Sequence, residues 1–133
     1  MGRQEGRVIK AGHCEGEALV SPEPLSFFGG VDAETGRIVE PGHPLEGQSI
    51  AGRVLVFPTA KGSTVGSYIL YRLRKAGLAP AGLINAESEP IVAVGAIIAG
   101  IPMVDHVDIT QVKTGDRVAI DGASVTWQGV VSV

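Results

Sequence analysis

A polar turn at residues 61–67 carries the groups in this sequence best suited to chemistry. It reads Lys-Gly-Ser-Thr-Val-Gly-Ser and follows an apolar run at 53–57. From Val65 onward, apolar residues recur at helical spacing, at Val65, Ile69, Leu73 and Ala76. The first N–H groups of a helix lack intrahelical partners and lie at the positive end of its dipole, so they attract anions. We therefore expect this turn to face a carboxylate, a phosphate or a developing oxyanion.

Ser63 is the candidate catalytic residue of the turn. A serine hydroxyl holds its proton tightly, so it acts as a proton acceptor only where N–H groups and a cation stabilise its alkoxide. Lys61, Gly62, Thr64 and Val65 are the candidates for that support and for binding the substrate. The order Lys-Gly-Ser does not match a Walker A loop, and no Gly-x-Ser-x-Gly elbow surrounds the serine. The alternative is that Ser63 or Thr64 only caps the helix, and the two roles can coexist.

A second polar group follows the apolar run at 82–85. Asn85, Glu87, Ser88 and Glu89 would lie at the carboxyl edge of a sheet, where α/β proteins often bind ligands, or would only cap the next helix.

We expect structural roles for the histidines and the single cysteine. His13, His43 and His106 are predicted to be exposed or hydrogen-bonded rather than metal ligands, and Cys14 to be unreactive rather than a nucleophile. Phe27 and Phe28 indicate either a partner surface or part of the core.

These residues must be positioned by a mixed α/β domain spanning residues 1–133. Turn residues and apolar patterning predict helices at 65–76 and 91–99, ended by glycines, and a long irregular region at 29–52. Strands are expected at 7–10, 17–20, 53–57, 82–85, 101–104, 108–112, 117–121 and 125–133. The helices should cover part of a compact sheet or barrel.

Composition excludes several classes of function. The net charge of −3, the absence of a basic run and the low aromatic content argue against nucleic-acid binding. No apolar stretch approaches the roughly 20 residues of a membrane helix, so a cytoplasmic protein is expected. A single cysteine cannot by itself hold an iron–sulfur cluster, so another chain would have to supply the ligands of any such cluster.

Several segments occur in the order typical of one family. They are residues 28–32, 43–45, 61–68, 79–81, 89–97 and 100–102. On these motifs the chain resembles the small subunits of the aconitase X family, and most of all the archaeal branch that acts on phosphomevalonate. The resemblance implies an aconitase-like swivelling domain with a β/β/α barrel. It also places the family's serine proton acceptor on Ser63.

The resemblance further implies a partner and a reaction. A large subunit would carry a [4Fe-4S] cluster whose iron is a Lewis acid for the leaving hydroxyl, and the two chains would form a heterodimer or a larger assembly. The reaction would be the dehydration of (R)-5-phosphomevalonate to trans-anhydromevalonate 5-phosphate, in a modified mevalonate pathway to isoprenoids. Two alternatives stay open: the small subunit of a cis-3-hydroxy-L-proline dehydratase, and a non-catalytic anion-binding or assembly module.

Overall fold

The computed structural model describes residues 2–62 and 65–129. Within them the chain forms one eight-stranded sheet and two α-helices. The strands are β1 (Gly2–Glu5), β2 (Arg7–Lys10), β3 (His13–Val20), β4 (Val54–Phe57), β5 (Gly82–Asn85), β6 (Met103–Asp105), β7 (Arg117–Asp121) and β8 (Ser124–Gln128). The helices are α1 (Gly66–Ala76) and α2 (Pro90–Ala99), with a 3₁₀ turn, η1, at Ile109–Gln111.

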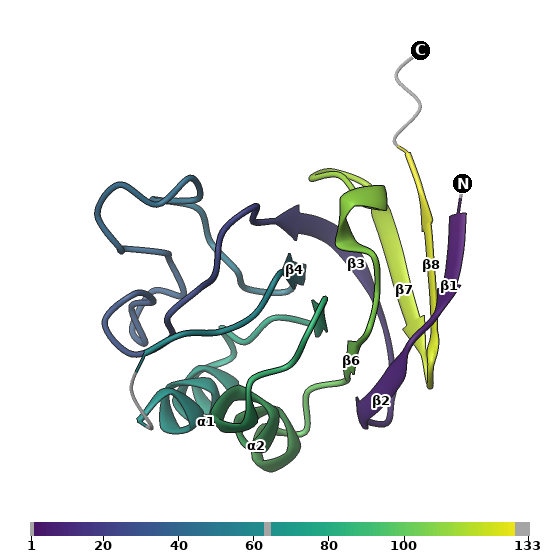
Figure 1. The fold of residues 1–133 in the computed structure, drawn as a ribbon. Coiled ribbons are helices and arrows are strands. Elements are labelled where there is room, and N and C mark those ends of the chain that lie inside the picture. The colour runs from purple at the N-terminus through teal and green to yellow at the C-terminus, as the bar shows by residue number, and fades with distance from the viewer. Residues whose placement is uncertain (1, 63–64, 130–133) are drawn as a thin grey trace.

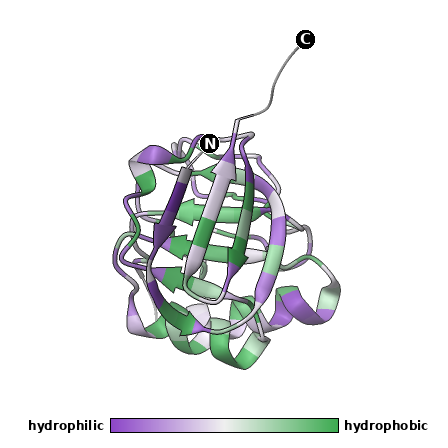
Figure 2. Ribbon diagram, turned by 90° about the vertical axis from the view of Figure 1, so that its right-hand side faces the viewer, coloured by the Kyte–Doolittle hydropathy of each residue, from purple (hydrophilic) through white to green (hydrophobic). Residues whose placement is uncertain are grey.

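The sheet follows the order β1-β8-β7-β3-β4-β5-β6-β2. Strands β3, β4, β5 and β6 are parallel, whereas β1, β8 and β7 pair antiparallel and join the first half of β3. The helices α1 and α2 lie side by side below the parallel strands (Figure 1). Seen from the side, the antiparallel strands lie in front of largely hydrophobic strands that cross behind them (Figure 2). The result is a layered β/β/α arrangement.

The first ten residues bring the two edges of the sheet together. β1 pairs with β8 at one edge and β2 pairs with β6 at the other, so one continuous segment spans both. Gly6 lies at the bend between them. A Cβ there would come within 2.4 Å of Val104 Cγ1 and 2.5 Å of the Asp105 carbonyl oxygen. The absence of a side chain at Gly6 therefore lets the sheet approach a closed barrel.

Two buried clusters hold the layers together. Because neighbouring strand residues point to opposite faces, Val54 and Val56 join the cluster inside the barrel, whereas Leu55 and Phe57 join the cluster beneath the helices. The helical cluster also buries Leu70 of α1, together with residues of the irregular segment at 25–50. The irregular region predicted at 29–52 is thus a packed cover of the sheet rather than a detached loop.

Local signals fix the helix ends. α1 ends at Gly77 and α2 at Gly100, both in the left-handed conformation, as predicted. Pro90 occupies the first turn of α2, and the Glu89 carboxylate accepts hydrogen bonds from the N–H groups of Ile91 and Val92. At Glu89, capping is therefore the observed role.

Several predicted bounds differ from the structure. The strand predicted at 108–112 is wrong, because Asp108 accepts hydrogen bonds from the N–H and the hydroxyl of Thr110 and closes the 3₁₀ turn instead. β1 was not predicted, and β3 begins four residues before the predicted 17–20. Val65 and Ala76, expected on the buried face of α1, are exposed.

Candidate functional site

The carboxyl edge of the parallel strands collects most of the predicted site residues. Strands β3, β4, β5 and β6 run in the same direction, so the segments that follow them start at one edge of the sheet. Residues 58–62 follow β4, residues 86–89 follow β5, and His106 follows β6. Ligands of parallel α/β sheets bind at such edges, outside the strand ends.

The polar turn at residues 61–67, which we call the reactive turn, packs in its described part against the segment around Leu25 and Ser26. The Lys61 N–H donates to the Leu25 carbonyl oxygen over 2.9 Å, which continues the bridge between Leu25 and Ala60. Gly62 has a φ of 104°, and a Cβ there would lie 2.7 Å from Ser26 Oγ, so both the conformation and the space require glycine. Ser63 and Thr64 lie outside the described residues.

Lys61 is exposed and paired. Its Nζ lies 3.3 Å from Glu40 Oε2 in an ion pair whose lysine side chain is 53% exposed. An exposed pair of this kind contributes little stability, so the lysine can exchange the carboxylate for a bound anion at low cost. Lys61 therefore stays a candidate for anion contact, with Glu40 as a resident competitor that the sequence did not reveal.

Asn85 is fully buried at the end of β5 and lacks one hydrogen bond. Its Nδ2 donates to the carbonyl oxygens of Phe57, over 3.0 Å, and Ile84, over 3.2 Å. Its Oδ1 has no partner among the described residues. The register pairs Asn85 with Phe57, so its side chain lies on the helical face of the sheet. An open, buried acceptor is costly, which marks this position as a candidate for function rather than simple packing.

Asp105 anchors the loop that leads into α2. Its buried carboxylate accepts hydrogen bonds from Arg7 Nε over 2.9 Å and Arg7 Nη2 over 2.7 Å. It also accepts one from the Ser88 N–H over 2.9 Å. Burial opposes ionisation of the carboxyl, but the hydrogen bonds from Arg7 and Ser88 outweigh it and lower the pKa of Asp105 to about 2. Asp105 thus links the β5–α2 loop, through the Ser88 N–H, to β2, through Arg7.

The histidines divide between the surface and one buried site. His13 is exposed, and His106 is half exposed with its Nε2 4.0 Å from Glu87 Oε2. His43 is buried: its Nδ1 accepts from the Leu45 N–H, and its Nε2 lies 3.3 Å from the Pro24 carbonyl oxygen. The prediction that these residues are exposed or hydrogen-bonded is confirmed. His106 adopts a φ of 59°, an unusual conformation for a side-chain-bearing residue.

Cys14 and the two phenylalanines take different environments. Cys14 is partly buried, and burial raises the pKa of its thiol to about 11, which disfavours the reactive thiolate. Phe27 is buried and packs edge-to-face against Phe57 at 6.0 Å, whereas half of Phe28 is exposed. Phe27 is therefore part of the core, whereas a partner surface at Phe28 stays a prediction.

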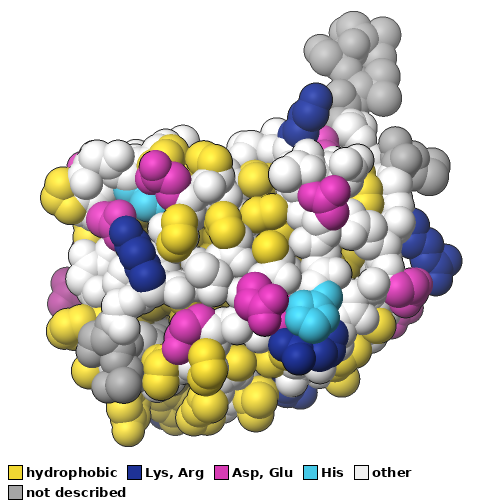
Figure 3. Space-filling model, in the orientation of Figure 1, with side chains coloured by type: hydrophobic (Ala, Val, Ile, Leu, Met, Phe, Trp, Pro, Cys, Tyr) yellow, Lys and Arg dark blue, Asp and Glu magenta, His cyan; other side chains and the backbone are white. Residues whose placement is uncertain are grey.

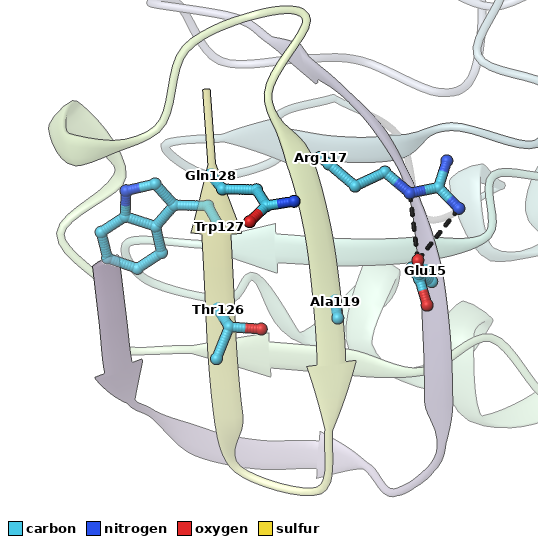
Figure 4. A pocket seen from close by; sticks show the side chains of 6 residues that line it. All are labelled: Glu15, Arg117, Ala119, Thr126, Trp127 and Gln128. Carbon is cyan, nitrogen blue, oxygen red and sulfur yellow. Dashed lines mark hydrogen bonds and ion pairs between the residues drawn. The ribbon is translucent and has the colours of Figure 1, made fainter. Parts of the chain in front are cut away.

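Two hollows differ in their relation to this edge. One of about 500 Å³ lies at the carboxyl edge, and hydrophobic side chains gather at the centre of the face drawn in Figure 3. Its lining is mostly apolar, with Ser21, Asp108 and Thr110 as polar members. The other, of about 280 Å³, lies on the antiparallel strands, where Arg117 and Glu15 are turned toward each other in an ion pair (Figure 4). The first is lined by Pro58 and Ala86, which directly follow β4 and β5, whereas the second lies away from this edge.

The described residues do not fit a metal centre. In the ranges 2–62 and 65–129, no three His, Cys, Asp or Glu side chains gather as potential ligands. Cys14, the one cysteine of the sequence, lies on β3 with its Sγ against Gly82. These residues offer no set of thiolates for an iron–sulfur cluster. Among the same residues, no helix is both long enough and apolar enough to cross a bilayer.

Sequence patterns did not predict three residues that contribute to the site: Arg7, Glu40 and Ser26. Arg7 is 98 positions from Asp105, and Glu40 is 21 from Lys61, so no local spacing links the members of either pair. Only the glycine at position 62 carried a local signal of the close approach by Ser26.

Comparisons with known proteins agree with this geometry. The family described as the aconitase X swivel domain matches residues 3–129. The phosphomevalonate dehydratase small subunit of Methanothrix thermoacetophila is 60% identical over 115 residues, covering 85% of this chain and 84% of that protein. The protein of the same name from Thermococcus gammatolerans is 56% identical over 116 residues, covering 87% and 88%. The crystal structure of Thermococcus kodakaraensis aconitase X in its holo-form superposes with a TM-score of 0.94 at 51% identity, covering 96% and 99%.

Proposed function

This chain belongs to the aconitase X swivel-domain family, and we propose that it is the small subunit of a phosphomevalonate dehydratase, active only with a large subunit. The observation that carries the proposal is the identity of 60% to a phosphomevalonate dehydratase small subunit over most of both chains. The position of the reactive turn, directly after β4 at the carboxyl edge of the sheet, supports it.

The proposed reaction removes water from (R)-5-phosphomevalonate. Ser63, as its alkoxide, takes the proton from the carbon next to the carboxylate. The hydroxyl on the neighbouring carbon leaves with its electron pair as hydroxide, and a carbon–carbon double bond forms. The hydroxide gains one proton to become water and Ser63 loses the proton it took, so the products are trans-anhydromevalonate 5-phosphate and water and the alkoxide is restored. Such a proton is weakly acidic, so a water-excluded site and prepositioned N–H donors lower the barrier.

The other turn residues are assigned to support this step. The N–H groups of Gly62, Thr64 and Val65 would stabilise the serine alkoxide and hold the substrate, and Lys61 would exchange Glu40 for a substrate anion. A [4Fe-4S] cluster belongs, in this proposal, to the large subunit, since the described residues of this chain provide no ligand set for it.

The test is reconstitution with the large subunit. The chain is co-expressed with that subunit, and dehydration of 5-phosphomevalonate and of cis-3-hydroxy-L-proline is followed side by side. We expect turnover of the phosphorylated substrate and none by either subunit alone. Preference for the hydroxyproline would replace the proposed substrate by the alternative one. Anion binding by this chain alone, without turnover in the complex, would favour a non-catalytic module.

The role of Ser63 is tested in the same complex. Ser63→Ala should lower kcat by roughly 10²–10⁴-fold, the range typical of general acid–base groups, while the complex still assembles. Ser49→Ala is the matched control, because its hydroxyl only accepts from the Ala51 N–H in the irregular segment. Wild-type turnover by Ser63→Ala would refute the assignment.

A further inference from the structure

The outer surface of the two helices is apolar where a surface helix is normally polar. On α2, Val94, Ile97 and Ile98 are 48%, 51% and 59% exposed, and on α1 Tyr68 is 67% exposed. We call these four residues the apolar helix face. Figure 3 shows hydrophobic side chains crowded along the lower edge of the molecule, where Figure 1 places α1 and α2.

The composition of α2 indicates that this face is covered in the working protein. The helix reads Pro-Ile-Val-Ala-Val-Gly-Ala-Ile-Ile-Ala and contains no polar side chain. Its inner side buries Val92, Ala96 and Ala99 against the sheet. A helix that is apolar on all sides is typical of a buried element, because an exposed helix normally carries polar residues on its outer side. Exposed apolar patches of this kind mark interaction sites.

The face is continuous with the reactive turn. Val65, the turn residue directly before α1, is 39% exposed, and Tyr68 lies in the first turn of that helix. Tyr68 and Val94 flank the closest approach of the two helices, where a Cβ on Gly95 would lie 2.9 Å from Ser67 Cα. A surface that approaches the turn from outside therefore also approaches this face.

We propose that the apolar helix face is the surface on which the large subunit docks. The inference rests on the proposed function, in which the substrate lies between the reactive turn and that subunit. The exposed side chains of Arg72, Arg74 and Lys75 lie on the later part of α1 and give one border of the face a positive charge. The matching surface of the large subunit is then apolar at its centre and carries carboxylates toward that border.

The experiment measures binding separately from turnover. The full chain and its Ile97→Asp and Ile98→Asp variants are titrated against the purified large subunit by calorimetry. Each substitution places a carboxylate in the apolar centre, so we expect the Kd to rise at least tenfold. Thr126→Asp, on the exposed side of β8, is the control and should leave the Kd within twofold. Because both isoleucines are half exposed, the circular dichroism and Tm of the isolated variants should match the wild type.

Other outcomes overturn the docking surface or locate the failure elsewhere. A wild-type Kd for both isoleucine variants overturns it, even if the complex dehydrates phosphomevalonate. If the same variants instead convert a self-associated chain to monomers without changing the Kd for the large subunit, the occupant is a second copy and the proposal is wrong. A complex that loses affinity in both variants but never dehydrates phosphomevalonate supports the surface and refutes the proposed function.

Discussion

Neutralising Asp105 should cost more stability at neutral pH than in strong acid. The carboxylate is buried, accepts two hydrogen bonds from Arg7 and one from the Ser88 N–H, and joins β2 to the β5–α2 loop. Asp105→Asn keeps the size of the side chain but removes its charge. It also places an amide N–H₂ group next to the Arg7 guanidinium and the Ser88 N–H, which are donors and cannot accept a hydrogen bond from it.

The lowered pKa sets the size of the effect. Burial opposes the charged form, but the hydrogen bonds bring the pKa of Asp105 from its usual 3.8 to about 2. Each pKa unit is worth about 1.4 kcal/mol, so the charged form gains at most roughly 2.5 kcal/mol on folding. Half of the Arg7 side chain is exposed, and water screens the pair, so we expect a loss of about 1–2 kcal/mol for Asp105→Asn at pH 7.

The sign of the pH dependence follows from the same shift. Because the pKa is lower in the folded state, the unfolded chain binds more protons, and the stabilisation is complete above the unfolded pKa near 4. It is lost as the pH falls through about 2, because below that pH the carboxyl is protonated in both states. The difference in unfolding free energy between wild type and Asp105→Asn should therefore shrink between pH 4 and pH 2.

Urea denaturation from pH 7 to pH 2 provides the measurement, with the two proteins compared at each pH. Glu5→Gln is the control, since that carboxylate pairs with Arg3 on the surface and its loss should matter much less. A difference between wild type and Asp105→Asn that stays constant down to pH 2 would contradict the reasoning. So would a variant as stable at pH 7 as the wild type.

Three further changes test the packing, a helix end and the thiol. Gly95→Val should destabilise the chain by roughly 1–3 kcal/mol in urea, because its Cβ alone would lie 2.9 Å from both Ser67 Cα and Leu70 Cδ1. Glu89→Ala should cost about 1 kcal/mol by leaving two N–H groups of α2 uncapped, and Glu89→Gln should cost less, as thermal unfolding can show. Burial raises the pKa of the Cys14 thiol from its usual 9.0 to about 11, so at pH 8 a disulfide reagent should react roughly a hundredfold more slowly with the folded than with the urea-unfolded chain. Equal rates would show that the thiol is not protected.

The elements that sequence predicts well are those with a local cause. The continuous apolar run of β4 indicated a strand buried on both faces, and its residues do divide between the two core clusters. Gly77 and Gly100 ended the helices as predicted. Gly2–Glu5 carries no apolar pattern, and it becomes a strand only because β8 offers its edge. The 3₁₀ turn depends on a short contact from Asp108, which hydrophobic alternation does not reveal.

The candidate site also contains features with a local cause in the sequence and features that depend on the fold. A turn after a buried strand and a polar group after the next strand are local patterns, and the structure brings the described members of both to one edge of the sheet. The pairing of Lys61 with Glu40 and of Asp105 with Arg7 depends on the order of strands and on the packing of the irregular segment. Neither could be derived without the fold, because each joins residues far apart in the sequence.

The use of charge at this edge explains why a second subunit is needed in the proposed function. Glu89 is committed to the N-terminus of α2, and Asp105 to Arg7 and the Ser88 N–H. The exposed Lys61 can exchange its partner carboxylate for another anion at little cost. A substrate with both a carboxylate and a phosphate needs more cationic groups than this one lysine. Among the described residues, the edge is thus built to position a reactive turn, and the remaining contacts to the substrate are expected from the large subunit.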